Sequence, residues 1–216
     1  MSRTTIIILV IGLVFLIGVG VAMYRLNDAG KREVVNQYRG SQFSITYPLE
    51  LELEEYANGS LSIGSTTTEG FRPAVELTIA TPAGDAVSAD FETFLLAQMK
   101  LLCNATGSGE SVSCNDVERS RAFSTKNGEN TTEYYLTLIS RPVAGGEVVT
   151  KSFGPIYTYV LPPREEDAAS AYAALIVYTP LASVLAGNAD QALLTRINDS
   201  VTIGGGSLAI PSQAPS

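Results

Sequence analysis

Residues 117–140, VERSRAFSTKNGENTTEYYLTLIS, are the stretch of sequence that decides the fold. Their centre, KNGE at residues 126–129, is a strong hairpin signal because it places an Asn-Gly pair between two segments with strand-forming composition. The flanking residues 117–125 and 132–140 are therefore predicted to be antiparallel strands. The hairpin continues as a meander through a turn at Gly145-Gly146, with further strands predicted at 148–153, 156–161 and 172–178.

The rest of the domain is predicted to add strands and two helices. Short segments in which apolar and polar residues alternate predict strands at 43–47, 50–56, 61–63 and 75–79. After a capping Ser88 or Asp90, residues 91–102 have apolar side chains at three- and four-residue spacing, which predicts a helix. A closing helix is predicted after Asp190. Because the helices follow blocks of strands, the expected fold class is α+β with an antiparallel sheet, not a doubly wound fold.

Residues 6–24 are predicted to be a transmembrane signal anchor. Residues 6–23 carry no charged side chain, and a helix of that length spans about 27 Å, close to a hydrocarbon core of about 30 Å. The alternative is a signal peptide cleaved after Ala22, since Gly20 and Ala22 form a small-x-small pattern, and the product would be secreted. The apolar run is longer than the usual signal-peptide core, which favours the anchor.

The predicted anchor divides the chain into segments of different character. Residues 1–5 form a short N-terminal flank, and residues 25–39 are a polar stem of mixed charge. A soluble α+β domain is expected over residues 40–203. Residues 204–216 are rich in Gly, Ser and Pro, and this composition predicts a disordered tail.

The orientation of the anchor has two opposing indications. Four basic residues follow the span at Arg25, Lys31, Arg32 and Arg39, and the positive-inside rule alone would place the domain in the cytoplasm. Cys103 and Cys114, however, flank a polar loop that can bring both sulfurs together, and a disulfide there would stabilise the fold by about 3 kcal/mol. Disulfides persist in oxidising compartments. We therefore expect an extracytoplasmic domain.

Composition excludes several classes of function. The chain contains no His, which removes the commonest general base and zinc ligand and every Ser-His-Asp arrangement. Its net charge of −8 disfavours binding to nucleic acid. No nucleophile elbow, P-loop or dinucleotide motif occurs in the soluble part. The sequence therefore predicts no catalytic residue, no metal ligand and no cofactor.

The segment Gly40-Ser41-Gln42-Phe43-Ser44-Ile45-Thr46-Tyr47-Pro48 resembles the G-x-F-S-I-x-Y-P start of PsbP-like domains. Residues 154–157 and 194–203 are similar to the corresponding parts of small, membrane-anchored bacterial members of that family. The resemblance implies an antiparallel sheet sandwiched by helices. It implies no site, because this chain has Leu49 and Leu51 where family members carry a Trp, and it has no His to make their metal and partner contacts.

Two groups of residues are candidates for a binding site. The acidic side chains of Glu50, Glu52, Glu54 and Glu55 could bind calcium or a cationic partner, but their alternation with Leu is typical of the solvent face of an amphipathic strand. Tyrosines could line a groove, but cross-strand and core packing is the favoured interpretation. The tyrosines are Tyr134, Tyr135, Tyr157, Tyr159, Tyr172 and Tyr178.

The expected function follows from these exclusions. The leading prediction is a membrane-anchored, extracytoplasmic, non-catalytic domain that binds or stabilises another cell-envelope protein. The alternative is a ligand-binding or sensory module held at the membrane. An enzyme ranks third, because without His it would have to rely on carboxylates.

Overall fold

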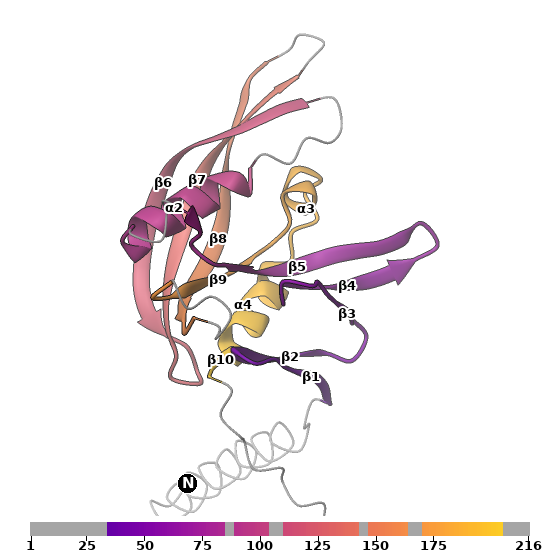
Figure 1. Cartoon of the computed structure of the whole chain (residues 1–216). Coiled ribbons are helices and arrows are strands. Elements are labelled where there is room, and N and C mark those ends of the chain that lie inside the picture. The colour runs from indigo at the N-terminus through magenta and orange to yellow at the C-terminus, as the bar shows by residue number, and fades with distance from the viewer. Residues whose placement is uncertain (1–33, 85–88, 104–109, 143–146, 164–169, 205–216) are drawn as a thin grey trace, which may run out of the picture. The chain divides into compact units, whose positions relative to one another are not determined.

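The antiparallel architecture is built around strand β9 (Ala173–Tyr178), which is buried at every position. A strand that is apolar throughout must be covered on both faces and therefore lies inside a sheet. The computed structural model describes residues 34–84, 89–103, 110–142, 147–163 and 170–204, and places β9 at the centre of a seven-stranded sheet (Figure 1).

The seven-stranded sheet has the order β3-β4-β5-β9-β8-β7-β6, and each neighbouring pair is antiparallel. The predicted hairpin forms between β6 and β7, where the Thr125 N–H donates to the Glu129 carbonyl at 2.9 Å. The prediction of an α+β fold with an antiparallel sheet is confirmed. The strands are β3 (Glu52–Glu55), β4 (Leu61–Thr67), β5 (Gly70–Ala80), β6 (Glu110–Ser124), β7 (Asn130–Pro142) and β8 (Val149–Leu161).

A second sheet of three strands, in the order β1-β2-β10, was not predicted from the sequence. β2 (Phe43–Pro48) pairs with β1 (Val35–Arg39), which occupies the last residues of the segment expected to be a stem. On its other side β2 pairs with β10 (Thr202–Ile203). Both flanking strands are short and β1 is mainly polar, so neither produces a clear hydrophobic pattern.

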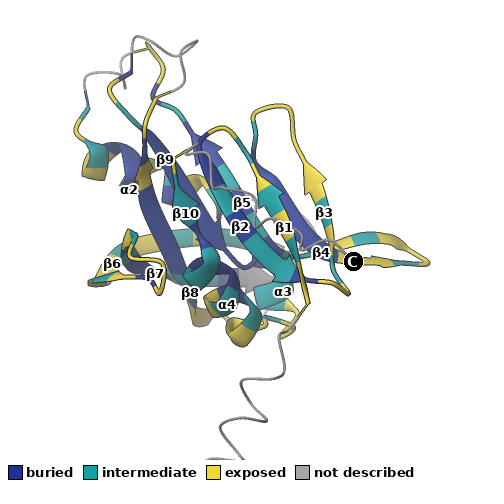
Figure 2. Ribbon diagram, turned by 90° about the horizontal axis from the view of Figure 1, so that it is seen from below, coloured by how far each residue is buried: buried dark blue, intermediate teal, exposed yellow. Residues whose placement is uncertain are grey.

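In the described part of the chain, three helices cover the seven-stranded sheet. α2 (Phe91–Leu101) and α4 (Gln191–Ser200) begin after the predicted caps Asp90 and Asp190, and α3 (Leu181–Leu185) follows β9. Alternate residues of β9 enter two different cores. One core contains side chains of α4 and β2, and the other contains side chains of α2 and α3. Strand β9, which is buried at every position, is dark blue in Figure 2.

One part of the predicted meander is wrong. The sequence predicts separate strands at 148–153 and 156–161, but β8 continues through Gly154 and Pro155. Pro155 cannot donate a ladder hydrogen bond, yet a sheet tolerates proline at a bulge. The partner strand β7 shifts register between Tyr134 and Leu136 at this point, so the pairing resumes beyond the proline.

The predicted N-terminal anchor at residues 6–24 lies outside the described residues, as do residues 1–5, 25–33 and 205–216. Within the part of the chain that the structure describes, no helix combines the length and the hydropathy that a membrane span requires.

Candidate functional site

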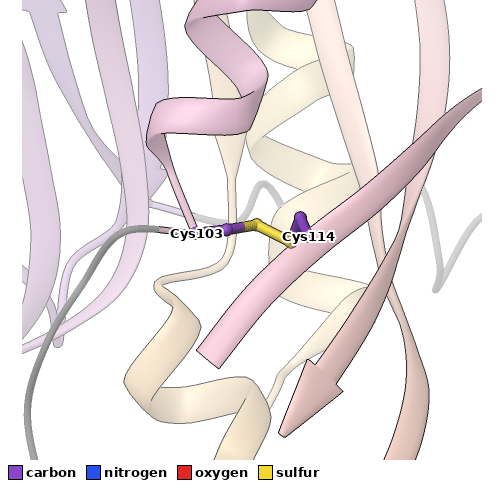
Figure 3. The surroundings of a disulfide bond; sticks show 2 residues. All are labelled: Cys103 and Cys114. Atoms are coloured by element: carbon purple, nitrogen blue, oxygen red, sulfur yellow. A yellow bond between two sulfur atoms is a disulfide. The ribbon is translucent and has the colours of Figure 1, made fainter. Parts of the chain in front are cut away.

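The two cysteines are the predicted site residues, and the structure brings them together. Cys103 directly follows α2 and is buried, and Cys114 lies on β6. A disulfide joins them across a Cα–Cα distance of 5.7 Å (Figure 3). The predicted disulfide is confirmed, and it indicates an extracytoplasmic domain because such bonds persist in oxidising compartments.

Most of the tyrosines that could line a groove are core residues. Tyr134, Tyr157, Tyr159 and Tyr178 are each at most 7% exposed. The Tyr159 hydroxyl donates to Asn198 Oδ1 at 2.5 Å, and burial raises the pKa of this phenol well above its ordinary value near 10. These four tyrosines belong to the two cores, and hydrogen bonds within the chain use the hydroxyls of Tyr159 and Tyr178. Both observations support the interpretation that the tyrosines pack in the core.

The acidic side chains of β3 and its flanks point to solvent. Glu50, Glu52, Glu54 and Glu55 are all exposed. Glu52 accepts a hydrogen bond from the Thr66 hydroxyl at 2.5 Å, and Glu55 accepts one from the Tyr38 hydroxyl at 2.8 Å. Among the described residues, no group of three or more potential metal-ligating side chains occurs.

A large open groove of about 960 Å³ lies between α4, the small sheet and the tip of the β6–β7 hairpin. We call it the α4 groove. The helix residues that line it are spaced by three and four positions and form one face of α4, whereas Leu194 and Ile197 on the opposite face enter the core. The lining includes Gln37, Ser44 and Thr46 of the small sheet, Lys126 and Asn127 of the hairpin, and Ala192, Thr195, Arg196 and Asp199 of α4.

Asn127 fixes the hairpin wall of the groove to the end of α4. Its side-chain amide donates to the Ser200 carbonyl at 3.0 Å and lies 3.2 Å from Thr202 Oγ1. Glu129 Oε1 accepts a hydrogen bond from the Ile203 N–H at 2.9 Å, which fixes β10 to the same hairpin. The hairpin is therefore held against the C-terminal segment by side-chain hydrogen bonds.

The wall formed by the small sheet is connected to α4 by the hydroxyl group of Ser200. Ser200 Oγ accepts a hydrogen bond from the Thr46 N–H at 3.0 Å and contacts the Thr46 carbonyl at the same distance. These contacts connect β2 to the helix that forms the opposite wall. The three walls of the groove are thus held together by hydrogen bonds within the chain.

The groove lining has a different charge balance from the rest of the chain. It contains two cationic side chains, Lys126 and Arg196, and one carboxylate, Asp199. Lys126 Nζ lies 2.8 Å from Asp199 Oδ2, and the Lys126 side chain is 80% exposed. Since the chain carries a net charge of −8, this lining is a local cationic region on an acidic protein.

The α4 groove could not be predicted from the sequence, because its lining residues come from three segments far apart in the chain. One signal was available: the polar face of the closing helix contains a cation and a carboxylate. The position of the hairpin tip beside that face depends on tertiary packing and could not be read from local pattern.

Comparisons with known proteins do not assign this chain to a family. A comparison of the chain with known protein families gave no match, and a comparison with curated proteins gave no significant match.

Proposed function

We propose that this chain is a membrane-anchored, extracytoplasmic, non-catalytic domain that binds another cell-envelope protein through the α4 groove. The observation that carries the proposal is the prearranged groove, whose three walls are connected by the hydrogen bonds of Asn127, Glu129 and Ser200. A preformed groove suits recognition of a polypeptide segment, since little of the binding energy is spent on ordering the site.

The charge of the groove selects the kind of segment that it would bind. Lys126 is largely exposed, and Arg196 lies one helical turn from Asp199 on the same face of α4. A partner segment that carries a carboxylate would complement the exposed ammonium group of Lys126. Lysine-rich segments would be repelled by the two cationic side chains of the lining.

A PsbP-like arrangement is part of the proposal. It is supported by the resemblance of residues 40–48 and by the antiparallel sheet, which carries α2 and α4 against opposite faces. Such a fold is compatible with a binding role, but the role itself rests on the α4 groove.

A matched pair of substitutions tests the groove. Ala192 is an exposed residue of α4 in the groove, and Ala97 is an exposed residue of α2, which packs on the other face of the sheet. A photo-crosslinking side chain placed at position 192 of the membrane-held chain should capture one envelope protein. Ala192→Arg should abolish its co-purification from detergent, whereas Ala97→Arg should leave it unchanged. Equal recovery with both variants would remove the groove from the proposal.

The membrane setting needs a separate test. We propose that residues 6–24 are retained as the anchor and that the domain lies outside the cytoplasm, with cleavage after Ala22 as the alternative for the anchor. In intact cells, Cys103 and Cys114 should react with a membrane-impermeant thiol reagent only after unfolding and reduction. Free thiols that can be labelled only from the cytoplasm would contradict the compartment, and a mature chain lacking residues 1–22 would contradict the anchor.

The alternative function, a ligand-binding module held at the membrane, has one observation in its favour. A second, smaller polar hollow lies on β4 and β5, away from the α4 groove.

A further inference from the structure

The second hollow lies on the face of β4 and β5 that points away from α4. Leu61 and Leu77 of these strands enter the core shared with α4, and the intervening side chains project to the other face. This other face is polar at β4 and β5. It forms a hollow of about 500 Å³, which we call the β4–β5 hollow, with a lining that includes Tyr56, Asn58, Ser60, Ser62, Glu76 and Thr78.

Pairing across three strands places the polar groups of the hollow in a row. Ser62 of β4 is opposite Glu76 of β5, and Glu76 is opposite Tyr178 of β9. Thr78 is the next residue of β5 on the same face, and its hydroxyl lies 3.3 Å from the Tyr178 hydroxyl. Glu54 of β3 pairs with Ser62 at the outer end of the row and adds a second carboxylate nearby.

The rim of the hollow is formed by a fixed turn. The Tyr56 N–H donates to the Ser60 carbonyl at 2.8 Å, and Ser60 Oγ accepts a hydrogen bond from the Ile79 N–H at 2.9 Å. The Tyr56 hydroxyl lies 3.3 Å from Ser62 Oγ, while half of the Tyr56 side chain is exposed. The aromatic ring is therefore held at the edge of the hollow with part of its surface open to a ligand.

The three oxygen-bearing side chains have the spacing that an ammonium group requires. Cross-strand neighbours such as Ser62 and Glu76 are about 5 Å apart, and residues two apart on a strand, such as Glu76 and Thr78, about 6.6 Å. A point equidistant from the three Cβ atoms lies about 4 Å from each of them, within reach of their side-chain oxygens. An ammonium has three N–H donors and no acceptor, so a carboxylate and two hydroxyls can satisfy it completely.

We propose that the β4–β5 hollow binds the ammonium group of an alkylamine, with Glu76, Ser62 and Thr78 as its acceptors and the Tyr56 ring against its alkyl chain. The lining includes no Lys or Arg among the described residues, so no cation of the protein competes for Glu76 there. An aromatic ring beside a bound cation contributes a further attraction. The chemistry is shared by free alkylamines and by lysine side chains.

This site does not depend on the proposed partner groove. The α4 groove is lined by α4, the small sheet and the hairpin tip, whereas the β4–β5 hollow lies on β4, β5 and the turn before β4, and no residue lines both. Ala192→Arg should therefore leave binding to the β4–β5 hollow unchanged, and failure of one proposal would be distinguishable from failure of the other.

The test is a titration of the full chain in detergent micelles at low ionic strength, followed by NMR through the side-chain signals of Thr78, a lining residue that every variant retains. The probes are propylammonium, Nα-acetyl-lysine methylamide and the neutral form of the latter acetylated at Nε. Both ammonium probes should shift the signals to saturation, and the neutral probe should not. If only the lysine derivative binds, the ligand is a lysine side chain, and equal binding of both identifies the alkylammonium group itself.

Three variants complete the test. Glu76→Gln should weaken binding of the ammonium probes by about tenfold or more, as expected for the loss of a charge-assisted hydrogen bond. Glu118→Gln, an equal charge change on an exposed residue of the distant strand β6, should have no effect. Tyr56→Ala, at the exposed rim, removes the ring that would contact the alkyl chain while keeping Glu76, and it should also weaken binding. Saturation by the neutral probe, or equal losses in the Glu76 and Glu118 variants, would overturn the proposal.

Discussion

At the scale of single residues, Asn127 has a structural role that its neighbours in sequence do not reveal. Its amide nitrogen lies within 3.4 Å of three oxygens at the end of α4 and the start of β10. Only Asp116 among the described non-glycine residues has a positive φ, so alanine fits the backbone at position 127. Asn127→Ala should lower the free energy of unfolding by about 1 kcal/mol through these lost hydrogen bonds, measured by urea denaturation.

A matched substitution in the same hairpin separates this effect from a general loss of asparagine. Asn130 is exposed, and its side chain makes one hydrogen bond, with the exposed Ser124 hydroxyl at 3.1 Å. Asn130→Ala should change the free energy of unfolding by less than about 0.5 kcal/mol. Equal losses in the two variants would show that Asn127 does not hold α4.

At the scale of elements, the disulfide connects α2 to the edge strand β6. Cys103 and Cys114 are 11 residues apart, and closing a loop of that size stabilises a fold by about 3 kcal/mol in the chain-entropy model. The Cys103→Ser/Cys114→Ser double variant should lose about that much stability in urea denaturation. Reductant should destabilise the native chain and leave the double variant unaffected. Reductant sensitivity in both would assign the effect to something other than this bond.

The β4–β5 hairpin depends on one glycine. At Gly64 the pairing shifts register, and a Cβ atom there would collide with the Arg72 carbonyl oxygen and lie 2.8 Å from Pro73 Cα. Both obstacles are backbone atoms, so the strands would have to separate. Gly64→Ala should cost about 1 to 3 kcal/mol of unfolding free energy. Ser65→Ala, at the exposed neighbouring position, is the control and should be close to neutral; a neutral Gly64→Ala would show that the bulge can relax.

The elements differ in how far the sequence could predict them. α2 and α4 were predictable because apolar spacing and the caps Asp90 and Asp190 agree. β1 and β10 were not, because a short polar strand is stabilised by its partner β2 and not by its own pattern. The cysteine pair was predictable from local chain geometry. The α4 groove was not, since it exists only when β2, the hairpin tip and α4 are packed together.

At the scale of the whole molecule, the two cores make the domain sensitive to alkaline pH. Tyr159 lies in the core shared with α4, and Tyr178 lies in the core shared with α2. Burial raises the pKa of both phenols above the ordinary value near 10, and the nearby Glu76 carboxylate raises that of Tyr178 further. In the unfolded chain both groups lose their protons near pH 10. The unfolded state is therefore the first to ionise as the pH rises.

Because the unfolded state ionises first, the stability of the domain should fall as the pH rises above 10. Below pH 10 both states hold the phenolic protons, and the full stability is present. Above pH 10 the unfolded state binds fewer protons, so the free energy of unfolding should fall by about 1.4 kcal/mol per pH unit for each of the two tyrosines until the folded phenols ionise as well. Urea denaturation at pH 9, 10 and 11 measures this slope.

The Tyr159→Phe/Tyr178→Phe double variant should start less stable at pH 9, because the hydrogen bonds to Asn198 and Thr78 are lost. Its slope should be clearly shallower than that of the native chain, and an unchanged slope would show that ionisation of other groups governs the alkaline transition.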